Sequence, residues 1–167
     1  MHTILILGGG KSAIFLIDFL AKSCQTKPRK LILADINLVS AQENLKNQLN
    51  TEARQLDIED VAARQSLIKE ADVVISMLPA FMHPIVAKDC LEFGKHFFSA
   101  SYESEEMRGM RSEIEAKGLF FLNECGLDPG IDHMSAMQII NLAKSKGEEI
   151  ISFKSYCGGL LAPESED

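Results

Sequence analysis

Six residues near the start of the chain have the types and spacing of a dinucleotide-binding loop. The pattern Gly8-x-Gly10-x-x-Ala13 directly follows an apolar run that begins at Thr3. It matches the dinucleotide fingerprint in the variant with alanine as the third small residue. The first small residue allows a tight turn, the second lets a pyrophosphate approach the backbone, and the third lets the next helix pack closely on the sheet. The helix then directs its free amides at the phosphates. We therefore expect this loop to bind the cofactor through Gly8, Gly9, Gly10, Lys11, Ser12 and Ala13.

An ordinary glycine-rich loop has the same pattern, so a second signal matters. The apolar run 31–34 ends in Asp35, which lies 22 residues after Ala13. A carboxylate at about 20 residues accepts hydrogen bonds from the adenosine ribose and repels a 2′-phosphate. The next residues, Ile36 and Asn37, provide no cation for such a phosphate, so the sequence favours NAD over NADP. The alternative is that Asp35 only caps the following helix.

The string GGGKS also invites a P-loop interpretation. The first P-loop glycine would have to lie five places before Gly10, where the sequence has Leu5. The P-loop interpretation therefore fails.

Further candidates follow later apolar runs. Asp57 and Ile58 come after a short run at 53–56 and would flank the adenine, although Asp57 could equally cap a helix. Leu78 ends the run 73–78, where the backbone would pass the nicotinamide ribose. His83 and His96 open a helix and a strand, and we expect both to be structural.

Two later loops are less easily explained as connections. Ser101 and Tyr102 lie in one of them, and residues 126–132 of the other contain two acids, a proline and two glycines. Such a composition fixes an unusual backbone path. Asp128 could orient a substrate ammonium, whereas Asp132 is expected to cap a helix. We assign no general base and predict no metal site.

Strand-like and helix-like segments alternate along the whole chain. This pattern predicts an α/β fold with a doubly wound, mostly parallel sheet of about seven strands, a Rossmann fold, whose ligands bind at the carboxyl ends of the strands. The strands are expected at 3–7, 31–34, 53–56, 73–78, 96–99, 119–122 and 151–156, and the helices at 12–23, 38–49, 59–69, 83–92, 105–117 and 132–145.

Composition excludes several classes of protein. A net charge of -7 argues against a nucleic-acid-binding surface. The four cysteines form no CxxC pair, which argues against a zinc site or a disulfide framework and favours a reducing, cytoplasmic compartment. The sequence shows neither a signal peptide nor an apolar run of about 18 residues, so we expect no membrane span.

Two late motifs resemble a known family. Residues 123–134, NECGLDPGIDHM, and 155–164, SYCGGLLAPE, are similar to the saccharopine dehydrogenase family, in its L-glutamate-forming branch. The glycine fingerprint and Ser101-Tyr102 fall where the family has them. The resemblance implies an enzyme of lysine metabolism that oxidises the secondary amine of saccharopine with NAD or NADP. Hydrolysis of the imine then gives L-glutamate and 2-aminoadipate 6-semialdehyde.

The resemblance also implies roles for individual residues. Ser101, Tyr102 and Asp128 would contact saccharopine. The cofactor would contact the glycine loop, Asp35, Asp57, Ile58 and Leu78, together with Leu127, Asp128, Pro129 and Gly130.

The domain organisation implied by the resemblance is incomplete in this chain. Residues 1–157 would form the dinucleotide-binding domain, and residues 158–167 would begin the crossover into a substrate and dimerisation domain that the sequence lacks. We therefore expect a fragment that binds nucleotide weakly and turns over no substrate, and a full-length protein that forms a homodimer through the missing domain.

Two other functions compete with this one. A non-catalytic NAD-sensing regulatory domain would share the glycine loop and the acid but has no need of the two late motifs. A carboxynorspermidine-type dehydrogenase of the same family would use the same imine chemistry. The sequence does not separate it from a saccharopine enzyme, because the missing domain would recognise the far end of the substrate.

Overall fold

The computed structural model describes residues 1–156 and 158, and its centre is a six-stranded sheet. The strand order is β3-β2-β1-β4-β5-β6, and every strand pairing is parallel. The strand order reverses between β1 and β4, and this is where doubly wound sheets bind nucleotides. The strands are β1 (His2–Leu7), β2 (Arg29–Asp35), β3 (Thr51–Gln55), β4 (Val73–Ser76), β5 (His96–Ser99) and β6 (Phe121–Leu122).

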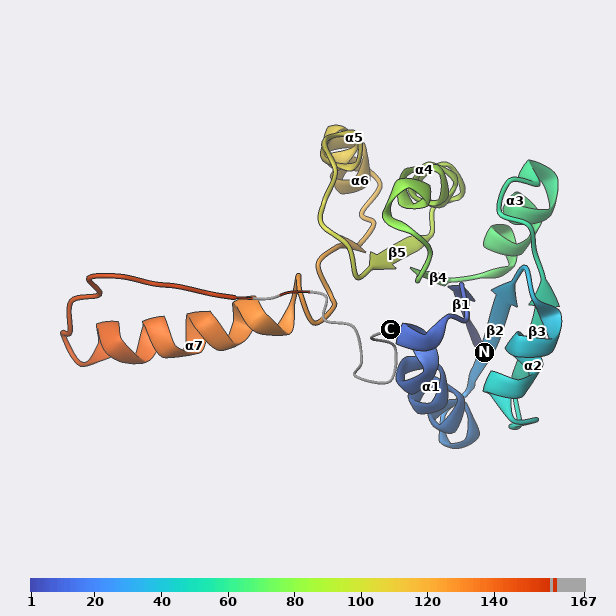
Figure 1. The fold of residues 1–167 in the computed structure, drawn as a ribbon. Coiled ribbons are helices and arrows are strands. Elements are labelled where there is room, and N and C mark those ends of the chain that lie inside the picture. The colour runs from blue at the N-terminus through green and yellow to red at the C-terminus, as the bar shows by residue number, and fades with distance from the viewer. Residues whose placement is uncertain (157, 159–167) are drawn as a thin grey trace, which may run out of the picture.

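Helices cover both faces of the sheet, as Figure 1 shows. One apolar cluster joins α1 and α2 to β1 and β2, with Ile6, Ile17 and Leu33 fully buried. A second cluster joins the other face to α3, α4 and α5, around Val74 and Phe97. The helices on the two faces are α1 (Ile14–Thr26), α2 (Leu38–Leu45), α3 (Val61–Glu70), α4 (His83–Phe93), α5 (Glu105–Gly109) and α6 (Arg111–Ala116), with short 3-10 turns η1 (Lys11–Ala13) and η2 (Ala80–Met82).

The predicted fold class is confirmed, with two corrections among its elements. The sheet has six strands and not seven, because residues 151–156 form no strand. Ile151 and Tyr156 are 93% and 87% exposed, so the segment has no neighbouring strand to pair with. The helix expected at 105–117 is divided between α5 and α6, next to Gly109, a residue type that weakens a helix interior. The predicted turn at 157–159 and the tail 160–167 lie outside the described residues, apart from residue 158.

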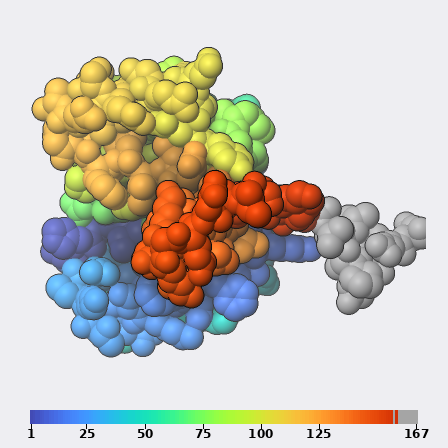
Figure 2. Space-filling model, turned by 90° about the vertical axis from the view of Figure 1, so that its left-hand side faces the viewer, coloured from blue at the N-terminus to red at the C-terminus, as the bar shows by residue number. Residues whose placement is uncertain are grey.

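The last helix, α7 (Ile131–Ser145), stands away from the sheet (Figure 1). None of its residues is buried. In Figure 2 the molecule is turned so that α7 comes toward the reader in front of the body. Among the described residues, no helix is both long enough and apolar enough to cross a membrane.

Candidate dinucleotide and substrate site

The glycine loop lies at the carboxyl end of β1 and has the predicted geometry. Gly8 has φ of +95°, and a Cβ there would lie 3.0 Å from the Met77 carbonyl oxygen, so glycine is required. At Gly10, in contrast, a Cβ would meet nothing within 4 Å, which leaves the backbone open to a ligand. Ala13 is 1% exposed and packs in the cluster beneath α1. The three small residues thus provide a turn, an open backbone and close helix packing.

Asp35 ties the glycine loop to the end of β2. Its Oδ2 accepts from the Gly9 amide at 2.7 Å, and its Oδ1 accepts from the Asn37 amide at 2.8 Å. The N-cap of α2 is Asn37, whose side chain accepts from the Ser40 amide. The helix-cap alternative for Asp35 is therefore wrong, and its carboxylate lies where the glycine loop meets the next strand.

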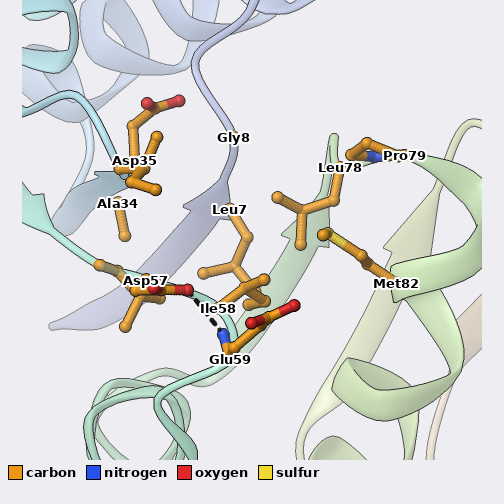
Figure 3. Close-up of a pocket in the computed structure, with 12 residues that line it drawn as sticks. Leu7, Gly8, Ala34, Asp35, Asp57, Ile58, Glu59, Leu78, Pro79 and Met82 are labelled. Atoms are coloured by element: carbon orange, nitrogen blue, oxygen red, sulfur yellow. Dashed lines mark hydrogen bonds between the residues drawn. The ribbon is translucent and has the colours of Figure 1, made fainter.

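A pocket of about 370 Å³ opens beside this loop (Figure 3). It contains five predicted residues, Gly8, Asp35, Asp57, Ile58 and Leu78. Leu78, expected beside the nicotinamide ribose, therefore shares a pocket with the residues expected at the adenosine. The other seven lining residues are not among the predicted cofactor contacts. Most of them are direct neighbours of predicted ones, whereas Met82 comes from η2 and had no signal in the sequence. They are Leu7, Ala34, Ile36, Leu56, Glu59, Pro79 and Met82.

Asp57 lines this pocket and forms a turn in the loop between β3 and α3. Its Oδ1 accepts from the Glu59 amide at 2.9 Å, which closes a turn. The N-cap of α3 is Asp60, whose carboxylate accepts from the Ala63 amide. Asp57 therefore does not cap α3.

A buried ion pair holds the loop that lines this pocket. Arg64 of α3 donates from Nε to Asp89 Oδ2 of α4 at 2.6 Å, and from Nη1 to the Ile58 carbonyl at 2.5 Å. The two charged side chains are each 8% exposed. Gln65 donates to the second Asp89 oxygen. The pair thus joins two helices to the loop that carries Ile58.

A second, mainly apolar pocket of about 290 Å³ lies beyond the glycine loop. Of the predicted cofactor residues only Ser12 lines it, and Lys11 is exposed. The remaining lining residues come from α1 and from the ends of β4, β5 and β6. They are Leu16, Ile75, Met77, Phe98, Ser99, Ala100, Cys125 and Gly126. The signal that could have found Ala100 and Gly126 is their place in the loops that follow two parallel strands, β5 and β6.

The three predicted substrate residues are held close together. Tyr102 donates from its hydroxyl to Asp128 Oδ1 at 2.8 Å, and this hydrogen bond raises the pKa of Tyr102. The loops that follow β5 and β6 are joined by the Glu124 amide, which donates to the Ser101 carbonyl at 3.0 Å. Residues that are 26 positions apart therefore share one surface.

The loop 126–130 is a tight turn that requires its second glycine. Gly130 has φ of +149°, and a Cβ there would lie 2.1 Å from the Gly126 carbonyl oxygen. Leu127 and Asp128 are exposed between the two glycines. Pro129 accepts from the Gly126 amide at 2.9 Å through its carbonyl.

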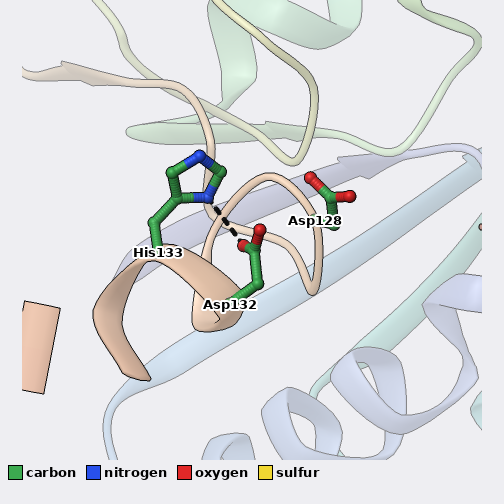
Figure 4. A group of neighbouring side chains, drawn as sticks. All are labelled: Asp128, Asp132 and His133. Atoms are coloured by element: carbon green, nitrogen blue, oxygen red, sulfur yellow. Dashed lines mark hydrogen bonds and ion pairs between the residues drawn. The ribbon is translucent and has the colours of Figure 1, made fainter. Parts of the chain in front are cut away.

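Figure 4 shows how Asp132 and His133 continue this loop into α7. The Asp132 carboxylate reaches back to the Gly130 amide at 3.0 Å and lies 2.7 Å from His133 Nδ1. Asp132 is not the N-cap residue, since α7 is capped at Gly130. The possible ligand atoms of Asp128, Asp132 and His133 lie within 4.8 Å of one another. Asp128 accepts from Tyr102, while Asp132 accepts from the Gly130 amide and lies against His133, so each of the three side chains has a hydrogen-bond partner.

Two family models match this chain. Residues 4–122 match the family model described as the saccharopine dehydrogenase NADP binding domain, and residues 126–167 match the saccharopine dehydrogenase C-terminal domain. NADP is thus the cofactor named for this family's domain. The preference for NAD that Asp35 predicts is a finer statement and stays a prediction.

Curated relatives align with almost the whole chain. Alpha-aminoadipic semialdehyde synthase of Arabidopsis thaliana is 37% identical over 177 residues, which cover 96% of this chain and 17% of that protein. Saccharopine dehydrogenase [NADP(+), L-glutamate-forming] of Saccharomyces cerevisiae is 36% identical over 170 residues, 98% of this chain and 36% of that protein. The chain therefore spans much less than half the length of either relative.

A solved structure shows the same fold at the same level of identity. The apo saccharopine dehydrogenase (L-Glu forming) from Saccharomyces cerevisiae superposes with a TM-score of 0.85 and 36% identity. The match covers 100% of this chain and 37% of the yeast chain. On the sequence, the family models and the fold, this chain belongs to the saccharopine dehydrogenase family.

Proposed function

We propose that the chain binds a nicotinamide dinucleotide across the glycine loop. The observation that carries this proposal is the position of the loop between two pockets: Gly8 lines the first and Ser12 lines the second. A dinucleotide that crosses the open backbone at Gly10 places its adenosine half beside Asp35 and its nicotinamide half in the apolar second pocket. The helix end near Gly10 favours the pyrophosphate between them.

The full-length protein that contains this chain is proposed to act on the secondary amine of saccharopine. The bound cofactor would accept a hydride from the carbon that bears the nitrogen, and the nitrogen would lose a proton. Water then adds to the resulting imine and splits it into L-glutamate and 2-aminoadipate 6-semialdehyde. Family membership supports this reaction, as do the names of the fungal relatives. The cofactor performs the redox step, and the protein positions the substrate.

The substrate is proposed to lie beside the second pocket. Ala100 lines that pocket, and the next two residues, Ser101 and Tyr102, begin the surface that Asp128 completes. The exposed carboxylate of Asp128 attracts the substrate nitrogen while that nitrogen is protonated, and it can accept the proton that the nitrogen loses. Leu127, Pro129 and Gly130 hold this carboxylate at the edge of the cofactor site.

We also propose that more chain covers what this part leaves exposed. Phe120 and Leu122 at the edge of the sheet are 53% and 41% exposed, and α7 buries no side chain. The C-terminal-domain match begins at residue 126, and the yeast enzyme is almost three times as long as the region it shares with this chain. The boundary near residue 157, and dimerisation through the further domain, belong to the same proposal.

Calorimetric titration and an activity assay test the two parts separately. We expect the chain to bind NADH more tightly than NADPH, and we expect the full-length protein to oxidise saccharopine. Tighter binding of NADPH would contradict the Asp35 argument. Oxidation of carboxynorspermidine in place of saccharopine would replace the substrate but keep the cofactor site.

The cellular location is proposed to be a reducing compartment, the cytoplasm. The three cysteines among the described residues, Cys24, Cys90 and Cys125, are all free. Burial raises the pKa of each thiol, which keeps it in the less reactive protonated form. Cell fractionation of the full-length protein tests this location.

A further inference from the structure

His83 is a buried histidine whose two ring nitrogens each meet a serine hydroxyl. It is the first residue of α4, is 2% exposed, and packs edge-on against the Phe97 ring at 6.4 Å. Its Nδ1 lies 2.8 Å from Ser76 Oγ, and its Nε2 lies 2.8 Å from Ser101 Oγ. The ring thus connects the end of β4 with the loop that carries the proposed substrate residues.

The burial of Ser76 decides which ring nitrogen carries the hydrogen. Ser76 is 0% exposed, and His83 Nδ1 is the partner that the structure gives its hydroxyl. A buried hydroxyl hydrogen without an acceptor is costly, so Ser76 donates and Nδ1 accepts. A neutral imidazole has one donor nitrogen and one acceptor nitrogen. The hydrogen is therefore on Nε2, which donates to Ser101 Oγ. Burial also lowers the pKa of His83, which favours the neutral form of the ring.

This donation determines what Ser101 can offer a ligand. Because Ser101 Oγ already accepts from His83, its own hydroxyl hydrogen is directed elsewhere. Next to it, Tyr102 is bonded to Asp128, and the Ser101 carbonyl accepts from the Glu124 amide. Both the loop and the Ser101 side chain are thus held by hydrogen bonds, which leaves the hydroxyl hydrogen of Ser101 for a ligand. Saccharopine presents carboxylates, and a hydroxyl donates well to a carboxylate oxygen.

We propose that His83 is a positioning residue that makes Ser101 a hydrogen-bond donor to a substrate carboxylate. This inference rests on the proposed function and adds a residue that touches neither cofactor nor substrate. It distinguishes His83 from a histidine that only fills the core. A residue that only filled space would be replaced equally well by any side chain of similar size.

Two amide variants of the full-length protein separate these roles. In H83Q the side-chain amide nitrogen can take the place of Nε2 and still donate to Ser101. In H83N the shorter amide reaches toward Ser76 only. We expect H83N to raise KM for saccharopine about tenfold, the effect of one hydrogen bond to a charged group, and H83Q to raise it less than about threefold. KM for the nicotinamide cofactor should stay within about twofold in both.

A third variant tests the hydrogen assignment from the other side. S76A removes the hydroxyl that holds Nδ1 as the acceptor, so the ring hydrogen is free to move from Nε2 to Nδ1, and Nε2 would then accept from Ser101. We expect KM for saccharopine to rise in S76A although Ser76 is fully buried and contacts no ligand. Equal KM values for H83N and H83Q, or an unchanged KM in S76A, would overturn the proposal. Thermal unfolding of all three variants shows whether a change in KM only follows lost stability.

Nitrogen-15 spectra keep this proposal separate from the proposed reaction. In full-length protein labelled at histidine, the ring signals that disappear in H83Q belong to His83. We expect the shifts of a neutral ring with its hydrogen on Nε2. A hydrogen on Nδ1, or a charged ring at neutral pH, would overturn the assignment. A protein that shows the expected shifts but does not oxidise saccharopine would contradict the reaction alone.

Discussion

Single residues in this site are held by hydrogen bonds to backbone that is distant in the sequence. Asp35 is an example, since its carboxylate accepts from Gly9 and from Asn37 and so fixes the glycine loop and the start of α2. The same carboxylate is the group expected to accept from the ribose and to repel a 2′-phosphate. Its structural role and its role in cofactor selection can therefore be separated by two substitutions.

We predict that D35N and D35A change cofactor binding in different ways. Asn keeps one oxygen, enough for the Gly9 amide but not also for the Asn37 amide, and it has no charge, so NADPH should gain about tenfold over NADH relative to the unsubstituted chain. Ala leaves the Gly9 amide without its acceptor, so D35A should weaken binding of both cofactors. Calorimetric titration with NADH and NADPH measures both effects. An unchanged ratio of the two affinities in D35N would show that the charge of Asp35 selects nothing.

His83 leads to a prediction on stability and pH. Burial lowers its pKa below the ordinary value of 6.5. Below pH 6.5 the unfolded chain therefore binds more protons than the folded chain, and stability present above that pH is lost as the pH falls toward the lower folded pKa. The loss should not exceed about 1.4 kcal/mol per pH unit.

The matched variant for this prediction is H83Q, which has no titrating group at that position. Urea unfolding between about pH 8 and pH 5 should show the stability advantage of histidine over glutamine shrinking as the pH falls below 6.5. A constant difference between the two proteins over this range would contradict a lowered pKa.

At the scale of the element, the sequence predicted the parts of the chain whose pattern is local. Most of the alternating strands and helices lie where the sequence predicts them, as do the glycine loop after β1 and Asp35 at the end of β2. The roles of that loop and of Asp35 in cofactor binding stay predictions. The prediction of a seventh strand was wrong, because an apolar run forms a strand only if a partner strand lies beside it. Contacts between distant segments, such as His83 with Ser101, left no spacing in the sequence that could reveal them.

The ion pair between α3 and α4 supplies a prediction at this scale. Removing one partner leaves the other charge buried and unpaired, so D89N should lower the free energy of unfolding by about 3 kcal/mol. The double variant R64M/D89L removes both charges and should lower the free energy of unfolding much less. Urea unfolding measures these values. The control is K22A, at the exposed pair Lys22–Asp18, which should lower the free energy of unfolding by about 0.5 kcal/mol or less. If D89N cost no more than K22A, the pair would not hold the two helices together.

At the scale of the whole molecule, the region that matches the NADP-binding model is well packed, whereas the rest of the described chain is largely exposed. Both apolar clusters lie within residues 4–122, which match the NADP-binding family model. In contrast, α7 and the segment after it lie within the C-terminal-domain match, and no side chain of α7 is buried. An apolar helix that buries nothing gains no stability from packing, so the further chain that we propose should supply its partner surface.

Ile139 provides the test, because it is 70% exposed on α7 in this chain. In the full-length protein I139E should lower the free energy of unfolding by about 2 kcal/mol, since a charge would enter an apolar interface. In the 167-residue chain the same substitution should have little effect, because the side chain already faces water. The matched control is Q138E, which adds the same charge at the next, polar position and should change neither protein. Equal stability of I139E and Q138E in the full-length protein would mean that this side of α7 stays uncovered.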